Sequence, residues 1–225
     1  MVLITDTLES PGTFLLTHFV LRALRDSRRT LFLGLANPFE HYAAILRKTG
    51  LQLASEREKG NFVFVDGAGR RRSEALRSLL ESVDEFLGAS EKPLVVLDDV
   101  STLLWAGAPV LEVARFAARL RTSTLTYEFE EAGGSLVILQ HGDDLAALDS
   151  SDDTCLFRRL LQRSDIWLNT SSLASQTRGE LSIRRGPALV NDFELEDRSG
   201  ATAMQYKLED TGPVWSIKGL GKGFI

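Results

Sequence analysis

Hydrophobic positions along the chain form short apolar runs, separated by stretches with helical spacing. The runs show little alternation with polar residues, and TLFLGLA at 30–36 and LVILQ at 136–140 are apolar on both faces. Strands of this kind are typical of a parallel sheet covered by helices on both sides. The predicted strands are 2–5, 30–36, 62–65, 94–97 and 136–140. The predicted helices are 12–26, 40–49, 73–87, 109–121 and 154–163.

After residue 165 the pattern changes to paired strands. The segments are DIWLNT at 165–170, ELSIRRG at 180–186, MQYKLED at 204–210 and VWSIKG at 214–219. The sequence Thr211-Gly212-Pro213 predicts a hairpin turn between the last two. We therefore expect antiparallel strands that extend the central sheet. No long linker or repeat divides the chain, so residues 1–225 are predicted to form a single α/β domain.

Composition narrows the class of protein. Of the 225 residues 44% are hydrophobic, enough for a core, and the net charge of −5 gives no global attraction to nucleic acid. The single cysteine, Cys155, excludes an internal disulfide and a thiolate metal cluster. No apolar run approaches the roughly 20 residues that span a bilayer, and no signal-peptide pattern opens the chain. We expect a soluble intracellular protein.

The run PLVVLDD at 93–99 is an apolar strand that ends in Asp98 and Asp99. In phosphate-loop ATPases an aspartate at the end of a buried strand holds the shell of a magnesium ion. The structural alternative is that Asp99 caps the next turn while Asp98 accepts hydrogen bonds from a neighbouring loop. Glu40, just after the second strand, has the same two interpretations: a water-activating glutamate, or an ordinary acid in the first turn of a helix.

The first strand-to-helix loop lacks the residues that bind a polyphosphate. A phosphate loop reads G-x-x-x-x-G-K-[ST], and its backbone amides and lysine hold the phosphates. With Gly12 as the second glycine, Thr13 takes the place of the lysine and Phe14 that of the magnesium-binding hydroxyl. Glu9 adds a negative charge, and Pro11 removes one amide donor. We expect a nucleotide site that is only vestigial, with Gly12, Asp98 and Asp99 as its remnants.

Arginines gather in two further places and are the candidate contacts to RNA or to other subunits. Clustered arginines bind phosphates, but they are also common at protein interfaces and on solvated surfaces. The candidates are Arg70, Arg71 and Arg72 in the loop after the third strand, and Arg178, Arg184 and Arg185 on the C-terminal strands.

Five stretches, in this order and spacing, resemble the family of the sixth subunit of Elongator, the complex that modifies wobble uridines of tRNA. The stretches are LLTHFVLRAL (15–24), HYAAILRKTG (41–50), PLVVLDDVSTLL (93–104), SLVILQHGDD (135–144) and MQYKLEDTGPVWSIKGL (204–220). Together they extend over most of the chain. The resemblance implies a RecA-like fold without a conserved phosphate loop: a mostly parallel central sheet flanked by helices and extended by C-terminal antiparallel strands.

The resemblance also implies a function. Members of this family form a six-membered ring with the fourth and fifth subunits, two copies of each, attached to the catalytic part of Elongator. The ring binds tRNA, and ATP affects its release. A cytoplasmic and also a nuclear location is expected. Uridine chemistry belongs to another subunit with a radical S-adenosylmethionine domain, so no catalytic residue, cofactor or metal is expected in this chain.

Two other functions remain open from the residues alone. One is an active magnesium-dependent ATP hydrolase of RecA-like type, with an unorthodox site that uses Asp98 and Glu40. The other is a DNA-binding relative of the recombinases, because a fold does not fix a function. The acidic net charge and the missing loop lysine count against the second.

Overall fold

The computed structural model describes residues 1–67, 72–90, 92–125, 133–142, 151–175, 177–190 and 193–218. Its strands are β1 (Val2–Asp6), β2 (Thr30–Gly34), β3 (Phe62–Asp66), β4 (Leu94–Asp98), β5 (Ser135–His141), β6 (Ile166–Ser175), β7 (Arg178–Arg185), β8 (Met204–Glu209) and β9 (Gly212–Ile217). Its helices are α1 (Thr13–Arg25), α2 (Phe39–Lys48), α3 (Leu53–Glu58), α4 (Arg72–Gly88), α5 (Ser101–Trp105), α6 (Val110–Leu125) and α7 (Asp152–Leu161), with a 3₁₀ turn at Gly200–Thr202.

All nine strands belong to one sheet, in the order β3-β2-β4-β5-β1-β6-β7-β8-β9. The strands from β3 to β6 pair in parallel, and β6 to β9 pair as antiparallel neighbours. This is the RecA-like α/β architecture with C-terminal antiparallel strands that the sequence predicted.

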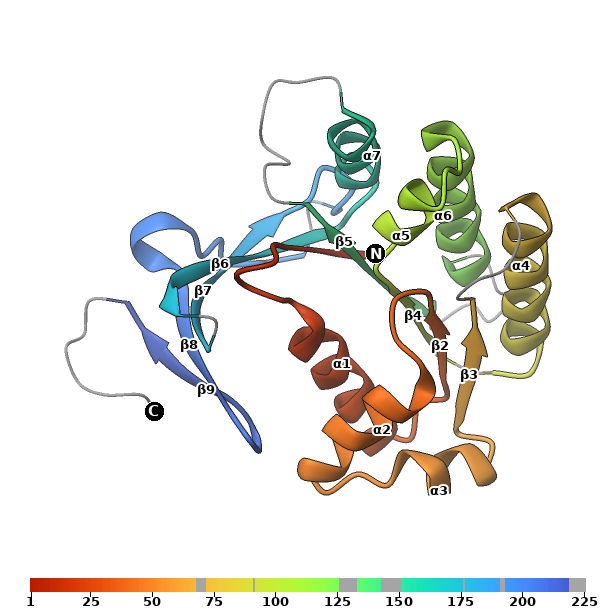
Figure 1. The fold of residues 1–225 in the computed structure, drawn as a ribbon, viewed down its shortest axis with the longest axis horizontal. Helices are drawn as coiled ribbons and strands as arrows, with labels where there is room; N and C mark the ends of the chain where they lie inside the picture. Colours follow the sequence, from red (N-terminus) through yellow and green to blue (C-terminus); the bar gives the residue numbers. More distant parts are fainter. Residues whose placement is uncertain are drawn as a thin grey trace.

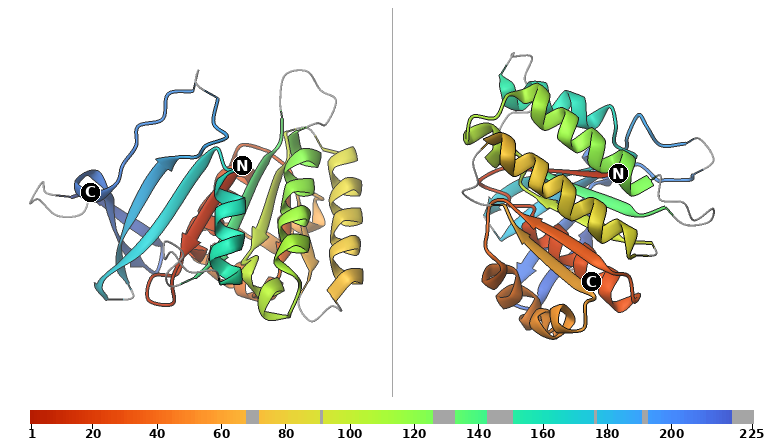
Figure 2. Two further views of the ribbon diagram at one scale, coloured as in Figure 1. Left: turned by 90° about the horizontal axis from the view of Figure 1, so that it is seen from above. Right: turned by 90° about the vertical axis from the view of Figure 1, so that its right-hand side faces the viewer.

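Helices cover both faces of the parallel part of the sheet (Figure 1). On one face α1, α2 and α3 pack against strand residues such as Phe32 and Val96, and on the other α4 to α7 pack against Leu33 and Leu97. Successive strand residues point to opposite faces, so strands between two helix layers must be apolar at every position. Figure 2 shows α4, α6 and α7 side by side along one face. In the described part of the chain, no helix has the length and apolarity needed to cross a membrane.

Two details of the structure differ from the predictions. The turn of the last hairpin consists of Asp210 and Thr211, because Gly212 already pairs with Glu209 and Pro213 lies within β9. Gly212 has φ 129°, which a glycine tolerates at the start of a strand. The short helices α3 and α5 were not predicted, since six and five residues carry too few periodic positions to be recognised.

Candidate functional site at the carboxyl edge of the sheet

The carboxyl ends of the parallel strands lie along one edge of the sheet, where RecA-like proteins bind nucleotides. Three adjacent strands, β4, β5 and β1, end there with Asp98, His141 and Asp6. Right-handed crossovers with helices on both faces place all these ends together. The remnants named from the sequence, Gly12, Asp98 and Asp99, therefore lie at one site.

Asp6 occupies the position at the start of α1 that would attract a phosphate. Its carboxylate is only 4% exposed. One oxygen, Oδ2, accepts a hydrogen bond from the Gly12 N–H at 2.6 Å, and the other, Oδ1, lies 2.8 Å from Nδ1 of His141. The N–H groups at a helix N-terminus favour an anion. Here the chain supplies that anion itself.

Several polar groups of the loop between β1 and α1 form hydrogen bonds within the chain. The Ser10 N–H donates to the Thr7 carbonyl at 3.1 Å, and the Ser10 and Tyr206 hydroxyls lie 2.7 Å apart. The Thr170 hydroxyl donates to the Ser10 carbonyl at 2.7 Å. Pro11 has no N–H to offer to a bound phosphate. The loop is fastened to the C-terminal strands.

Asp98 is almost fully buried, at 1% exposure, and holds the loop after β2. Its Oδ2 accepts hydrogen bonds from the N–H groups of Ala36 and Asn37, both at 3.3 Å. Burial raises the pKa of Asp98 to about 6, and the charge of Asp99 adds to the rise, against the effects of the Tyr42 hydroxyl and the two N–H groups. Burial and the Asp98 carboxylate in turn raise the pKa of Tyr42 above its usual value.

Asp99 fixes the turn that follows β4. The residue has φ 43°, and its Oδ1 accepts hydrogen bonds from the N–H of Ser101 at 3.2 Å and of His141 at 3.4 Å. Burial and the charge of Asp6 raise its pKa, while His141 and Ser101 lower it. These contacts of Asp98 and Asp99 are the ones that the structural alternative predicted.

The electrostatic character of the site is negative. Three buried carboxylates lie at this edge: those of Asp6 and Asp99 both interact with His141, and that of Asp98 interacts with Asp99. Within the described residues, no three histidine, cysteine or acidic side chains are placed to bind one metal ion together. A polyphosphate bound at the ends of β4, β5 and β1 would therefore lie beside these carboxylates.

The candidate arginines do not form one surface. Arg70 and Arg71 lie outside the described residues, and Arg72 begins α4 at the carboxyl edge. Since β7 runs antiparallel to β6, Arg178 lies at that same edge, whereas Arg184 and Arg185 lie at the opposite edge.

The two arginines at the end of β7 have different contacts. The exposed guanidinium of Arg184 lies 5.0 Å from the ring centroid of Trp167. That of Arg185 donates to the carbonyls of Phe193 at 3.0 Å and Val190 at 3.5 Å, so it holds the segment after β7. Arg185 therefore has a structural role, although its side chain, like those of Arg178 and Arg184, is exposed.

Sequence reasoning missed Asp6 and the contact between Ser10 and Tyr206. The predicted first strand ended at Thr5, one residue short of Asp6. An acid directly after a buried strand was a usable signal, the same one that identified Asp98. No local signal connects Ser10 with Tyr206, which is 196 positions later.

Fold and site together define a RecA-like α/β protein whose first loop is closed by an internal carboxylate. The family model of Elongation complex protein 6 matches residues 1–75. The chain is 28% identical to Elongator complex protein 6 of Xenopus tropicalis and 26% identical to that of Homo sapiens, each over 96% of this chain and 90% of the relative. A homolog from Schizosaccharomyces pombe is 33% identical over 30% of this chain and 26% of the relative. Over most of its length the chain is thus similar to the proteins named Elongator complex protein 6.

Proposed function

We propose that the chain is a non-catalytic subunit of an Elongator complex. In this role it forms a hetero-hexameric ring with the fourth and fifth subunits, attached to the catalytic part of the complex. The ring supports wobble-uridine modification by binding tRNA. The names of the family and its relatives support membership of the complex. We further propose a cytoplasmic location, with the nucleus as a second one.

The observation that carries the non-catalytic part of the proposal is the hydrogen bond from the Gly12 N–H to Asp6. A bound phosphate would have to displace a buried carboxylate from the start of α1 and then lie beside two more. Charges of the same sign at such distances repel strongly in a site of low dielectric constant. Assembly and RNA binding require no such displacement.

Titration of the isolated chain with magnesium-ATP in a calorimeter tests this part. We expect no binding heat, and no turnover of ATP. Micromolar binding that disappears in Asp98→Ala would instead support an ATP hydrolase. Comparing tRNA with single-stranded DNA over a salt series tests the third function, because a clear preference for DNA would favour a recombinase-like protein.

Exposed apolar side chains at the carboxyl edge support a role in assembly. Leu8 in the first loop is 70% exposed, Trp105 at the end of α5 is 59% exposed, and Leu111 is 45% exposed. The Trp105 ring lies 5.8 Å from that of His141, so it borders the site. Large apolar side chains that remain exposed in a single chain indicate a surface covered by a partner.

Co-purification with both sister subunits tests assembly directly. We expect one complex that contains all three chains, with two copies of each. A chain that stays monomeric in the presence of both would contradict the proposal. The same complex then serves for tRNA binding, to which the exposed Arg178 and Arg184 are candidate contributors.

A further inference from the structure

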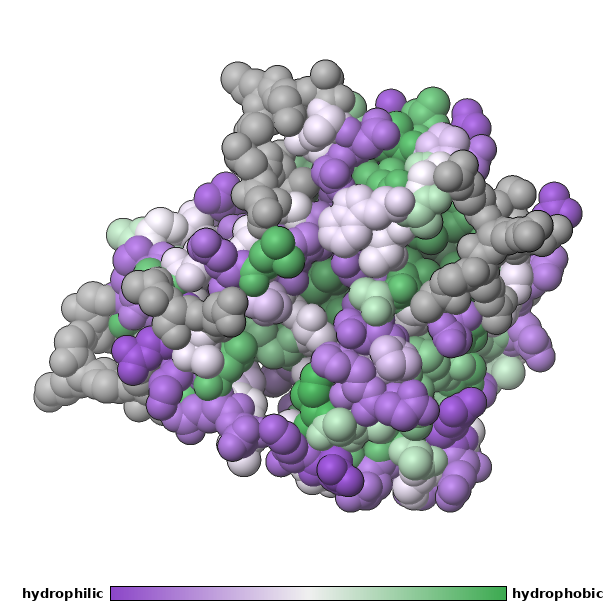
Figure 3. Space-filling view, in the orientation of Figure 1, coloured by the Kyte–Doolittle hydropathy of each residue, from purple (hydrophilic) through white to green (hydrophobic). Residues whose placement is uncertain are grey.

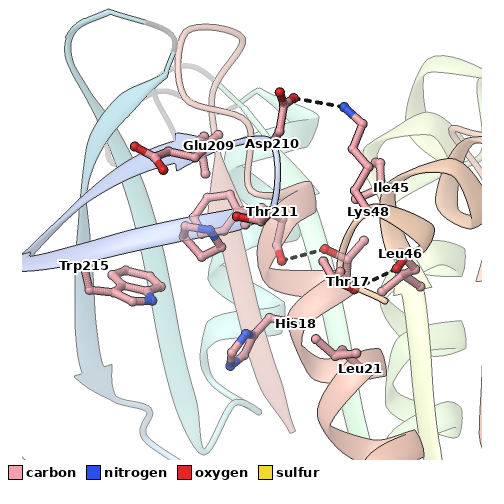
Figure 4. Close-up of a pocket in the computed structure, with 15 residues that line it drawn as sticks. Thr17, His18, Leu21, Ile45, Leu46, Lys48, Glu209, Asp210, Thr211 and Trp215 are labelled. Atoms are coloured by element: carbon pink, nitrogen blue, oxygen red, sulfur yellow. Dashed lines mark hydrogen bonds and ion pairs between the residues drawn. The ribbon is translucent and has the colours of Figure 1, made fainter. Parts of the chain in front are cut away.

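A pocket of about 410 Å³ lies between the first two helices and the last hairpin. Leu21 of α1, Ile45 of α2 and Trp215 of β9 are among its lining residues. Figure 4 shows Trp215 on the hairpin side and His18 and Leu21 on the helix side of the opening. In Figure 3 the surface is hollowed between the hairpin and these helices, with hydrophobic residues along the hollow. The volume falls within the roughly 300–1,000 Å³ of ligand pockets.

Two hydroxyl groups in the wall of the pocket are already used within the chain. The hydroxyl of Thr17 donates to the Phe14 carbonyl at 2.9 Å, and that of Thr49 donates to the Leu46 carbonyl at 2.8 Å. Both threonines thus use their hydrogen on their own helix, as the dashed lines in Figure 4 show. A group that enters the pocket is stabilised by apolar burial, not by these hydroxyls.

Charges at the rim cancel in pairs. Lys48 of α2 lies 3.1 Å from Asp210 in the hairpin turn, and Lys207 lies 2.7 Å from Glu209. Exposed pairs of this kind add little stability. They leave an approximately neutral rim, which suits an occupant without net charge.

The outer edge of β9 supplies the polar groups that the pocket lacks. β9 is the last strand of the sheet, and no described residue pairs with its outer side. In a hairpin with a two-residue turn, alternate positions bond to the partner strand and the others point away. Counting from the Glu209–Gly212 pair, the outward positions are Pro213, Trp215 and Ile217. Proline, which has no N–H, is typical of an outward position on an edge strand.

We propose that the β9 edge and this pocket together bind an extended segment of a partner protein. The segment adds a tenth strand to the sheet, pairing with the backbone groups of Trp215 and Ile217. A side chain at an alternate position enters the pocket, and its chemistry is apolar. Main-chain pairing supplies affinity and the pocket supplies selectivity, the recognition mode called β-augmentation. This inference goes beyond the proposed role in Elongator and does not depend on it.

A capped peptide of alternating threonine and leucine, added to the full chain, tests the proposal by ¹⁵N and ¹³C NMR. We expect saturable shifts at the Ile217 amide, the Trp215 indole and the Leu21 methyl groups. A capped peptide of alternating threonine and aspartate should give none, because the pocket does not stabilise a charge.

Two variants test the two halves of the site separately. Ile217→Pro removes an outward N–H without touching the bonds to β8, and Leu21→Asp puts a charge in the pocket. Each should weaken binding of the leucine peptide by roughly tenfold or more, the size of one lost hydrogen bond or one buried unpaired charge. The matched controls, Ile217→Val and Leu21→Met, should bind as the wild type does. If Ile217→Pro does not fold, the affinity of Leu21→Asp for the leucine peptide still tests the proposal.

Four results would overturn the inference. The first two are binding of the leucine peptide away from β9 and equally tight binding of the peptide to both variants. The third is a β9 edge that is paired in a dimer of this chain which the peptide does not dissociate. The fourth is an Ile217 amide that exchanges slowly in the isolated chain and fast once residues 219–225 are removed, which would assign the edge to the chain's own terminal segment.

Discussion

At the scale of single residues, Asp6 shows how a buried charge can substitute for a ligand. Its carboxylate accepts the Gly12 N–H and contacts His141, so it satisfies the groups that a phosphate would otherwise meet. Replacing Asp6 by alanine removes this acceptor. The surroundings of Gly12 are tightly packed, since a Cβ built there would lie 3.2 Å from a methyl group of Leu139. The Gly12 N–H would therefore stay buried and unpaired.

We therefore predict that Asp6→Ala lowers the free energy of unfolding by about 1–3 kcal/mol, the cost of a buried unsatisfied donor. Asp6→Asn should cost less, because its amide oxygen still accepts from Gly12. Urea denaturation measures both. Glu9→Ala, which removes an exposed acid from the same loop, is the control and should stay within about 0.5 kcal/mol of the wild type. Equal stability of Asp6→Ala and Glu9→Ala would contradict this account.

A second prediction at this scale concerns Asp98 and the pH dependence of folding stability. Its pKa of about 6 in the folded chain lies above the ordinary value of 3.8, so folding takes up a proton between these two values. Stability from this group is thus largest below about pH 4 and is lost as the pH rises to about 6.

Asp98→Asn, which cannot ionise, should accordingly be more stable than the wild type at pH 7, by about 1–3 kcal/mol. The difference should vanish near pH 4, where the wild-type carboxyl is also neutral. Urea denaturation at both pH values measures it. Glu40→Gln changes an exposed carboxylate in the first turn of α2, at the same edge, and serves as the control. A constant offset between Asp98→Asn and the wild type across this range would show that the charge of Asp98 is not the cause.

The candidate site was predictable from the sequence only where its residues follow strands. Asp98 and Asp99 could be placed because an apolar run precedes them directly. Which of their two interpretations holds depends on Ala36, Asn37 and Ser101, whose N–H groups reach them only in the folded chain. The pairing of Asp6 with His141, 135 positions apart, likewise results from the neighbouring positions of β1 and β5.

At the scale of elements, the strands and long helices followed from periodicity. The parallel strands are apolar at every position because both faces are covered, and the helices have one apolar side. Short elements such as α3 contain less than two turns and left no recognisable pattern. The hairpin turn was displaced by one residue because Gly212 and Pro213 suit a turn and the edge of a strand equally well.

The segment after β7 depends on one arginine. Arg185 donates two hydrogen bonds to carbonyls of that segment, and its own N–H donates to Asp197 at 2.7 Å. We predict that Arg185→Ala speeds limited proteolysis between residues 186 and 198 several-fold, while the midpoint of global unfolding changes little. The control is Arg184→Ala, which removes the neighbouring cation but none of these bonds. Equal cleavage rates for the two variants would refute this role for Arg185.

At the scale of the whole molecule, the fold class could be predicted but the strand order could not. The alternation of strands and helices indicates a parallel sheet. The position of β1 between β5 and β6 depends on contacts between segments more than 130 residues apart. The proposed assembly lies a further step away, because the surfaces that meet are determined by partners outside this chain.

The last prediction concerns tRNA binding by the proposed ring. Arg70 and Arg71 follow β3 in the sequence and lie outside the described residues, and Arg72 begins α4. If these arginines contact phosphates, replacing all three by alanine should weaken tRNA binding by about tenfold or more at low salt. It should also reduce the slope of the logarithm of the binding constant against the logarithm of the salt concentration by roughly one per lost phosphate contact. Assembly of the ring, measured by sedimentation, should change much less.

A matched variant separates this effect from net charge. Arg22, Arg25 and Arg47 are exposed near the ends of α1 and α2, at the opposite edge of the sheet, and their replacement by alanine removes the same charge. That variant should retain most of the tRNA affinity. Unchanged affinity in the first variant, or equal losses in both, would show that the loop after β3 does not contact tRNA. A loss of assembly as large as the loss of tRNA binding would instead assign these arginines to a subunit interface. Arginine is common at such interfaces.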